Sequence, residues 1–111
     1  MGKIDDLIPK MLAEAKKVDK TITEDLITKV CKYLGASLFK RDASLVAYSD
    51  KKELEGIRKK FVQKKLGIKD SDEKIDAAIM KVGEKYGLSN RAKKRAIVYA
   101  MLMKHYGMKD F

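Results

Sequence analysis

Few residues of this chain could perform acid–base or nucleophilic chemistry near neutral pH. The 111 residues include one histidine, His105, and one cysteine, Cys31. Catalysis of this kind needs a base placed beside a nucleophile, and one residue of each type gives little support for it. Cys31 shares a predicted helix face with Ile27 and Leu34, which favours a buried, inert thiol. His105 lies near a predicted helix end, where it can complement the helix dipole, so we predict no catalytic residues.

Metal and nucleotide sites are not indicated either. A structural zinc site needs about four cysteine or histidine ligands, and the chain has two such residues in total. The acidic segment 70–73 resembles a calcium loop only in part, because Lys74, Ile75 and Lys81 stand where a ligand, a glycine and a glutamate belong. Residues 83–87 lack the Gly-Lys-Ser/Thr ending of a phosphate loop. We therefore expect no metal and no cofactor.

Positive charge is concentrated between residues 51 and 69. This segment carries eight basic and two acidic residues, and the whole chain has a net charge of +10. A basic helix face is the electrostatic footprint expected of a surface that contacts phosphates, although such faces more often serve solubility. The candidate contacts in this segment are Lys51, Lys52, Arg58, Lys59, Lys60, Lys64 and Lys65.

A second basic cluster surrounds the expected start of the last helix. Its cations would face the positive end of the helix dipole, at a cost of about 0.3–1 kcal/mol each, so something should compensate. Either a neighbouring carboxylate such as Glu84 pairs with them, which is the interpretation we favour, or they bind an anion together with the free amides of the helix start. The candidate residues here are Ser89, Asn90, Arg91, Lys94 and Arg95.

The elements that would position these residues are helices. Four glycines that follow cations and a bulky residue mark predicted helix ends, because glycine adopts the left-handed conformation that closes a helix: Gly35, Gly67, Gly87 and Gly107. Residues whose side chains can cap free amides mark predicted starts: Asp5 or Asp6, Thr21, Asp50, Ser71 and Ser89. Apolar residues recur at helical spacing between starts and ends, which predicts five helices.

The sequence also predicts the local structure of three particular segments. The last helix should run from about residue 90 to Tyr106, and residues 96–103 are apolar on nearly every side, which is typical of a helix enclosed by its neighbours. Pro9 is compatible with the first helix only in its opening turn. Residues 36–49 should form short helical turns, since a strand at 44–48 would have no obvious partner.

Composition sets the class of protein. With 45% hydrophobic and 38% charged residues, the chain can form one folded domain, residues 1–111. It has no run of about 18 apolar residues that could span a bilayer, no secretion signal at its start, and a single cysteine that permits no internal disulfide. We expect a cytoplasmic all-α protein that does not bind membranes: a compact bundle of about five helices with a largely buried C-terminal helix.

Several short segments resemble a known family. Their order and spacing are similar to those of domain-of-unknown-function family 2853, a family of small bacterial helical proteins, over residues 26–107. The resemblance rests on Ser49, Asp50, Glu53 and Leu54, on Phe61, on Lys64 to Gly67, on Asp76 to Ile79, and on Ser89, Asn90, Arg91, Lys94, Arg95 and Ala96. One departure is Gly35-Ala36-Ser37 in place of Gly-Pro-Ser. The resemblance implies a compact helical bacterial protein and supplies no activity, cofactor or substrate.

The charge pattern therefore leads the functional hypotheses. We expect a non-enzymatic binding module that engages an acidic partner, with nucleic acid as the favoured class, through residues 51–65 with or without residues 89–95. A helix-turn-helix around Gly87 is disfavoured, because Lys93 stands where that motif normally buries an aliphatic side chain.

Two alternatives come from other classes of protein. The first is a protein-interaction or self-associating module, in which Phe39, Tyr48 and residues 108–111 supply exposed apolar contacts. The second is an enzyme acting on an anionic small molecule, for which the candidate residues are Ser89, Asn90, Arg91 and Asp50. The sequence indicates no oligomeric state.

Overall fold

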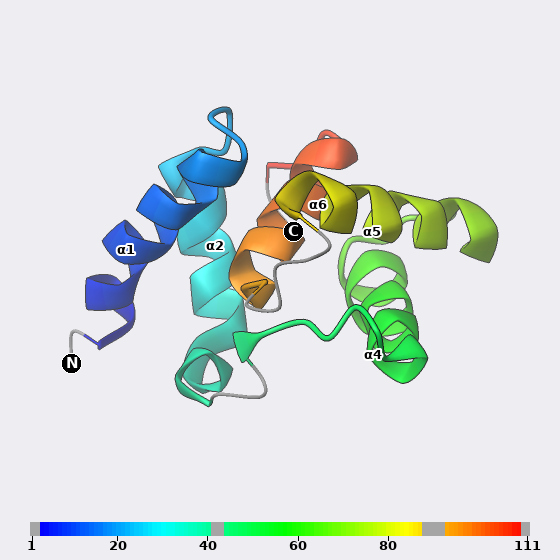
Figure 1. Ribbon diagram of the computed structural model, residues 1–111, viewed down its shortest axis with the longest axis horizontal. Helices are drawn as coiled ribbons and strands as arrows, with labels where there is room; N and C mark the ends of the chain where they lie inside the picture. Colours follow the sequence, from blue (N-terminus) through cyan, green and yellow to red (C-terminus); the bar gives the residue numbers. More distant parts are fainter. Residues whose placement is uncertain (1–2, 41–43, 88–92, 110–111) are drawn as a thin grey trace.

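Figure 1 shows the helices of the computed structural model, which describes residues 3–40, 44–87 and 93–109. They are α1 (Lys3–Val18), α2 (Glu24–Leu34), α4 (Lys51–Gly56), α5 (Asp72–Tyr86) and α6 (Arg95–His105). A 3₁₀ helix, η1 (Gly35–Phe39), follows α2, and a π-helix, η2 (Ile57–Lys65), continues α4. Within the described residues the extended pairing is limited to one isolated bridge, so the predicted all-α class is confirmed.

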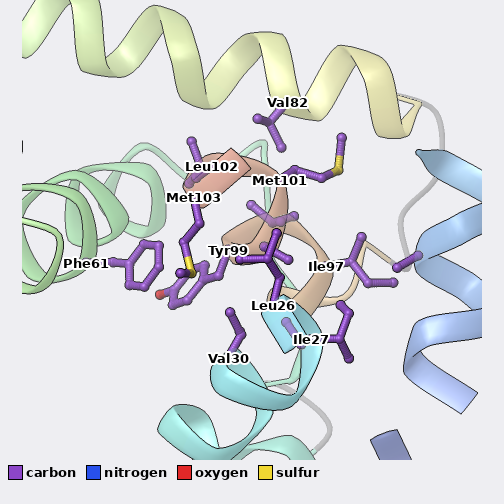
Figure 2. Packing of buried hydrophobic residues seen from close by; sticks show 14 of the residues in the cluster. Leu26, Ile27, Val30, Phe61, Val82, Ile97, Tyr99, Met101, Leu102 and Met103 are labelled. Atoms are coloured by element: carbon purple, nitrogen blue, oxygen red, sulfur yellow. The ribbon is translucent and has the colours of Figure 1, made fainter. Parts of the chain in front are cut away.

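Helix α6 is enclosed by the other elements. Every residue from Ala96 to Met103 is at most 7% exposed. Figure 2 shows its side chains directed toward several neighbours, with Met101 facing Val82 of α5 and the ring of Tyr99 beside that of Phe61 from η2. The centroids of these two rings lie 3.9 Å apart in a stacked arrangement. The prediction of a largely buried C-terminal helix is therefore confirmed.

The predicted helix ends are also found. All four glycines have positive φ angles, between 55° and 111°, a region that other residues avoid. At the end of α6, for example, the amide of Met108 donates to the carbonyl of Met103 over 2.8 Å, the closure that a Schellman motif makes. The glycine pattern thus located the stops correctly because it reflects a backbone requirement.

Two of the predicted helix starts, Asp50 and Ser71, are confirmed, and the predicted start at Thr21 is wrong. Asp50 accepts from the amide of Lys52, and Ser71 accepts from the amide of Lys74. Helix α2, however, is capped by Thr23 and not by Thr21. The hydroxyl of Thr21 is already bonded to Asp19, so the next threonine along takes the capping position.

The first helix begins earlier than we predicted from the position of Pro9, which was expected to lie in the opening turn. Because α1 starts at Lys3, Asp5 and Asp6 lie in its first turn, so the prediction that one of them caps the helix is wrong. Acidic side chains in that turn still complement the helix dipole. Pro9 lies inside the helix but is exposed, so water can solvate the carbonyl that its missing amide leaves without a donor.

The start of the last helix is a second correction. Helix α6 begins at Arg95, about five residues later than predicted, and Lys94 provides no side-chain cap. Lys93 and Lys94 instead run extended beside residues 45–46: Lys94 forms an antiparallel bridge with Leu45, and the amide of Val46 donates to the carbonyl of Lys93 over 2.9 Å. The segment at 44–48 therefore does find a partner, and the predicted cap Ser89 lies outside the described residues.

The side chains predicted to supply exposed apolar contacts differ in their environments. Phe39 is 52% exposed, as the interaction-module hypothesis expects. Tyr48 lies against Gly83 of α5, where even a methyl group would come within 2.3 Å of its ring, and its hydroxyl donates to the carbonyl of Ile79. Tyr48 is therefore half-buried and packs against α5, so it does not supply the exposed contact that the interaction-module hypothesis assigned to it.

None of the helices in the described ranges combines the length and the apolar composition that crossing a bilayer requires.

Candidate functional site

The outer side of α4 and η2 carries the densest group of exposed cations predicted from the sequence. We call this group the basic surface; it comprises Lys51, Lys52, Lys59, Lys60, Lys64 and Lys65, all of them exposed. The inner side of the same segment buries Ile57, Phe61 and Val62 in the core. One continuous helical segment therefore anchors itself through apolar side chains and presents lysines to solvent.

The second part of this segment, η2, has π-helical geometry. In a π-helix each amide donates to the carbonyl five residues earlier, and the amide of Leu66 donates in this way to Phe61 over 2.8 Å. Within this turn the adjacent residues Phe61 and Val62 are both buried in the core. π-helical segments are rare in proteins, and those that occur often lie at functional sites.

Arg58 lies on the same segment but is held inside the fold. Its guanidinium Nη1 is 2.9 and 3.1 Å from the two carboxylate oxygens of Asp76 on α5, and Nη2 is 3.9 Å from Asp72. The side chain of Arg58 is only 13% exposed. Arg58 thus ties η2 to α5, and we leave it out of the basic surface.

The basic cluster predicted at the start of the last helix also contains an arginine that is held inside the fold. Arg95 donates to the carbonyl of Leu45, to the hydroxyl of Tyr99 and to the carboxylate of Glu53, and it is 15% exposed. A carboxylate therefore does compensate this cation, as we favoured, but it comes from Glu53 of α4 and not from Glu84. Lys94 is half-buried. Ser89, Asn90 and Arg91 lie outside the described residues.

An exposed aromatic ring borders the basic surface. Tyr33 of α2 is 40% exposed, and the ammonium of Lys65 lies 5.3 Å from the centroid of its ring. The Tyr33 ring also contacts the buried Phe61, with centroids 5.9 Å apart and the rings tilted by 40°. Because the Lys65 ammonium lies over the ring, a planar group from solution can stack on Tyr33 by displacing that ammonium.

The sequence did not reveal a second charged cluster, which surrounds Asp19. We call it the Asp19 cluster; its members are Asp19, Thr21, Lys85 and Lys104. Oδ1 of Asp19 accepts from the amide and the hydroxyl of Thr21, at 2.9 and 2.5 Å. Oδ2 accepts from the ammonium groups of Lys85 on α5 and Lys104 on α6, at 3.0 and 2.9 Å.

The Asp19 carboxylate remains ionised although it is 7% exposed. Burial by itself would raise the pKa of Asp19, but hydrogen bonds from Thr21, Lys104 and Lys85 outweigh it and hold this pKa well below its usual range. One feature of the sequence could have drawn attention to Asp19. An acidic residue directly after a helix meets the negative end of the dipole and needs compensating partners.

The two residues first considered for catalysis lie in different environments. Cys31 is fully buried, and burial raises the pKa of its thiol to about 11, so the reactive thiolate is scarce at neutral pH. His105 is the exposed last residue of α6, and its ring meets the ring of Tyr106 edge-on. Among the residues that the structure describes, no group of three potential ligands could hold a metal ion.

Comparisons with known proteins place the chain in a wider group. A family model described as "Protein of unknown function (DUF2853)" matches residues 10–110, a span that includes both the basic surface and the Asp19 cluster. No curated protein matches the chain.

Proposed function

Because the chain belongs to the family described as protein of unknown function DUF2853, which confirms the predicted resemblance but assigns no activity, we propose a function from its surface. The protein is a non-enzymatic module that binds nucleic acid through the basic surface of α4 and η2. One observation carries the proposal: six lysines are exposed along a single helical segment whose opposite side is fixed in the core.

The acidic residues of the same segment do little to neutralise these lysines. Glu53 turns inward to Arg95, and Glu55 pairs with Lys59 over 3.1 Å at the exposed surface. Exposed ion pairs of that kind contribute little energy and exchange easily with other partners. A phosphate backbone could therefore replace Glu55 and contact neighbouring lysines of the segment at the same time.

The ring of Tyr33 favours nucleic acid over other acidic partners. A nucleic acid offers phosphates to the lysines and also bases that stack on an exposed aromatic ring once a phosphate draws the Lys65 ammonium away from it. Tyr33 touches Lys65 at one end of the basic surface, so a strand lying along the lysines would reach this ring. Base reading by α6 is not part of the proposal, because residues 96–103 are enclosed and leave no side for a groove.

The setting of the module follows from the same residues. We place it in the bacterial cytoplasm, where nucleic acid is accessible and where a single cysteine thiol such as that of Cys31 stays reduced.

The test compares two variants with equal charge. One carries Lys59→Gln, Lys60→Gln, Lys64→Gln and Lys65→Gln, and the other carries four substitutions on and just after α1: Lys10→Gln, Lys16→Gln, Lys17→Gln and Lys20→Gln. All eight lysines are exposed, and α1 lies at the opposite side of the molecule from α4 (Figure 1). Binding of a fluorescein-labelled oligonucleotide is measured by anisotropy at low salt.

The first variant should bind roughly tenfold or more weakly than wild type, because it loses up to four phosphate contacts. The α1 variant should bind nearly as well as wild type, since its substitutions lie away from the basic surface and weaken only the long-range electrostatic attraction of the protein for the oligonucleotide. Equal losses in both variants would show that net charge alone attracts the oligonucleotide and would overturn the assignment to this surface.

A further inference from the structure

Three members of the Asp19 cluster line a pocket that lies outside the basic surface: Asp19, Lys85 and Lys104. The pocket has a volume of about 450 Å³, within the range of small-ligand sites. It is lined by Asp19, Lys81, Val82, Lys85, Met101, Lys104 and His105. Helices α5 and α6 and the residue after α1 thus contribute to one hollow.

The carboxylate in this pocket has no acceptor capacity left for a ligand. A carboxylate offers about four acceptor positions, two on each oxygen. On Asp19, both positions of Oδ1 are used by Thr21, and both positions of Oδ2 are used by Lys85 and Lys104. Asp19 therefore acts as a positioning residue that holds two ammonium groups.

The two ammonium groups, by contrast, keep donors for a further partner. Each has three N–H groups, of which Asp19 takes one. The side chains of Lys85 and Lys104 are 53% and 37% exposed, so solvent reaches them. Because both bond the same oxygen, their nitrogens lie within about 6 Å of each other, a spacing that two oxygens of one phosphate group can bridge.

The charge and the remaining lining residues define the ligand. Three lysines and one carboxylate give the lining a net charge of +2, with His105 counted as neutral, and this charge complements a dianion. Val82 and Met101 supply an apolar floor beside the ammonium groups. We propose that this pocket binds a small organic phosphate, with its phosphate on Lys85 and Lys104 and its organic part against Val82 and Met101.

The test is an NMR titration of the isotopically labelled full chain with three probes: glycerol 3-phosphate, inorganic phosphate and glycerol. Glycerol 3-phosphate should cause saturable shifts of amide signals in residues 81–85 and 101–105. Inorganic phosphate should shift the same signals with lower affinity, because it lacks the organic part, and glycerol should leave them unchanged. Equal affinity for the two phosphates, or shifts that map only to the basic surface, would overturn the assignment.

Charge-matched variants make the test specific. Lys85→Gln and Lys104→Gln should each weaken glycerol 3-phosphate binding roughly tenfold, as expected for one charge-assisted hydrogen bond. Lys74→Gln, about three turns away on the same helix and also exposed, should bind like wild type. A Lys74→Gln loss as large as that of Lys85→Gln would overturn the proposal.

The two proposals can also fail separately. The variant with glutamine at 59, 60, 64 and 65 should keep its affinity for glycerol 3-phosphate, since none of these residues lines the pocket. If that variant loses phosphate binding as well, the pocket is not the site. Should Lys85→Gln or Lys104→Gln fail to fold, the position of the shifts in the wild-type chain still decides the outcome.

Discussion

The Asp19 cluster and the basic surface both concentrate lysines, but they differ in what surrounds the charge. In the Asp19 cluster a buried carboxylate fixes Lys85 and Lys104 from two helices. On the basic surface the lysines surround no buried acid among the residues that the structure describes, and Glu53 of the same segment is turned away to Arg95. The comparison teaches that a count of positive charges does not separate cations that hold the fold together from cations displayed to solvent, whereas the carboxylates that meet those charges do.

This difference should appear first in stability. Charges that pair at a buried carboxylate are poorly screened by salt and hold elements together, whereas exposed lysines contribute little to folding. Four predictions, from the largest expected effect to the smallest, follow from this contrast.

The largest effect is expected from Asp19→Asn. The substitution removes the charge on which Lys85 and Lys104 converge, and it should lower the free energy of unfolding by roughly 2–3 kcal/mol, since both lysines can still reach water. Urea denaturation at pH 7 measures the change. Glu84→Gln, an exposed change of equal charge, is the control and should cost little. Equal stability of Asp19→Asn and wild type would show that the cluster does not hold the helices.

The second prediction concerns acid. Because the pKa of Asp19 is lowered by folding, the unfolded chain takes up a proton near pH 4 while the folded chain keeps Asp19 ionised to lower pH. The contribution of Asp19 is therefore complete at neutral pH and is lost as the pH falls below about 4. The stability gap between wild type and Asp19→Asn should narrow from pH 7 to pH 3 in urea titrations. A difference in the free energy of unfolding that stays the same at every pH would contradict the assignment of this stability to the Asp19 charge.

A smaller effect separates two neighbouring cations of one helical segment. Arg58→Gln should cost roughly 1 kcal/mol, because it breaks a two-point ion pair with Asp76 in which the arginine is mostly buried. Lys59→Gln, which breaks the exposed pair with Glu55, should change stability by less than about 0.5 kcal/mol. Thermal unfolding of both variants tests this, and equal losses would remove the distinction between paired and displayed cations.

The smallest effect is expected from the basic surface itself. Neutralising Lys59, Lys60, Lys64 and Lys65 together should change the free energy of unfolding by no more than about 0.5 kcal/mol, because lost contacts are offset by relieved repulsion between lysines. The same urea titration measures it. A loss comparable to that of Asp19→Asn would mean that these lysines are structural and would undermine the proposed function.

Features set by local backbone chemistry could be predicted from the sequence. Glycine at a positive φ angle, aspartate or serine at a helix start, and an apolar run on every side of residues 96–103 each reflect one short segment. The enclosure of α6 and the exposure of the lysines on η2 followed from such patterns. Where two caps competed, as at Thr21 and Thr23, the choice depended on Asp19, a contact outside the capping pattern.

Features that depend on distant segments could not be predicted. The Asp19 cluster joins residues 66 and 85 positions apart, and no periodicity links them. Glu53 rather than Glu84 reaches Arg95, although the end of α5 also lies beside the start of α6, where the hydroxyl of Tyr86 accepts from the amide of Lys94. Glu84 is exposed on the surface of α5, and its position in the sequence does not reveal this. The pairing of residues 93–94 with 45–46 was missed for the same reason, and it displaced the predicted helix start.

The central claim is that the lysines displayed on η2 contact phosphates, and the salt dependence of oligonucleotide binding tests it most directly. For wild type, the logarithm of the binding constant should fall linearly with the logarithm of the salt concentration. In the variant with glutamine at 59, 60, 64 and 65 the slope should be smaller in magnitude by about 3, or slightly more, and in the α1 variant it should be unchanged. The same slope for all three proteins would contradict the account.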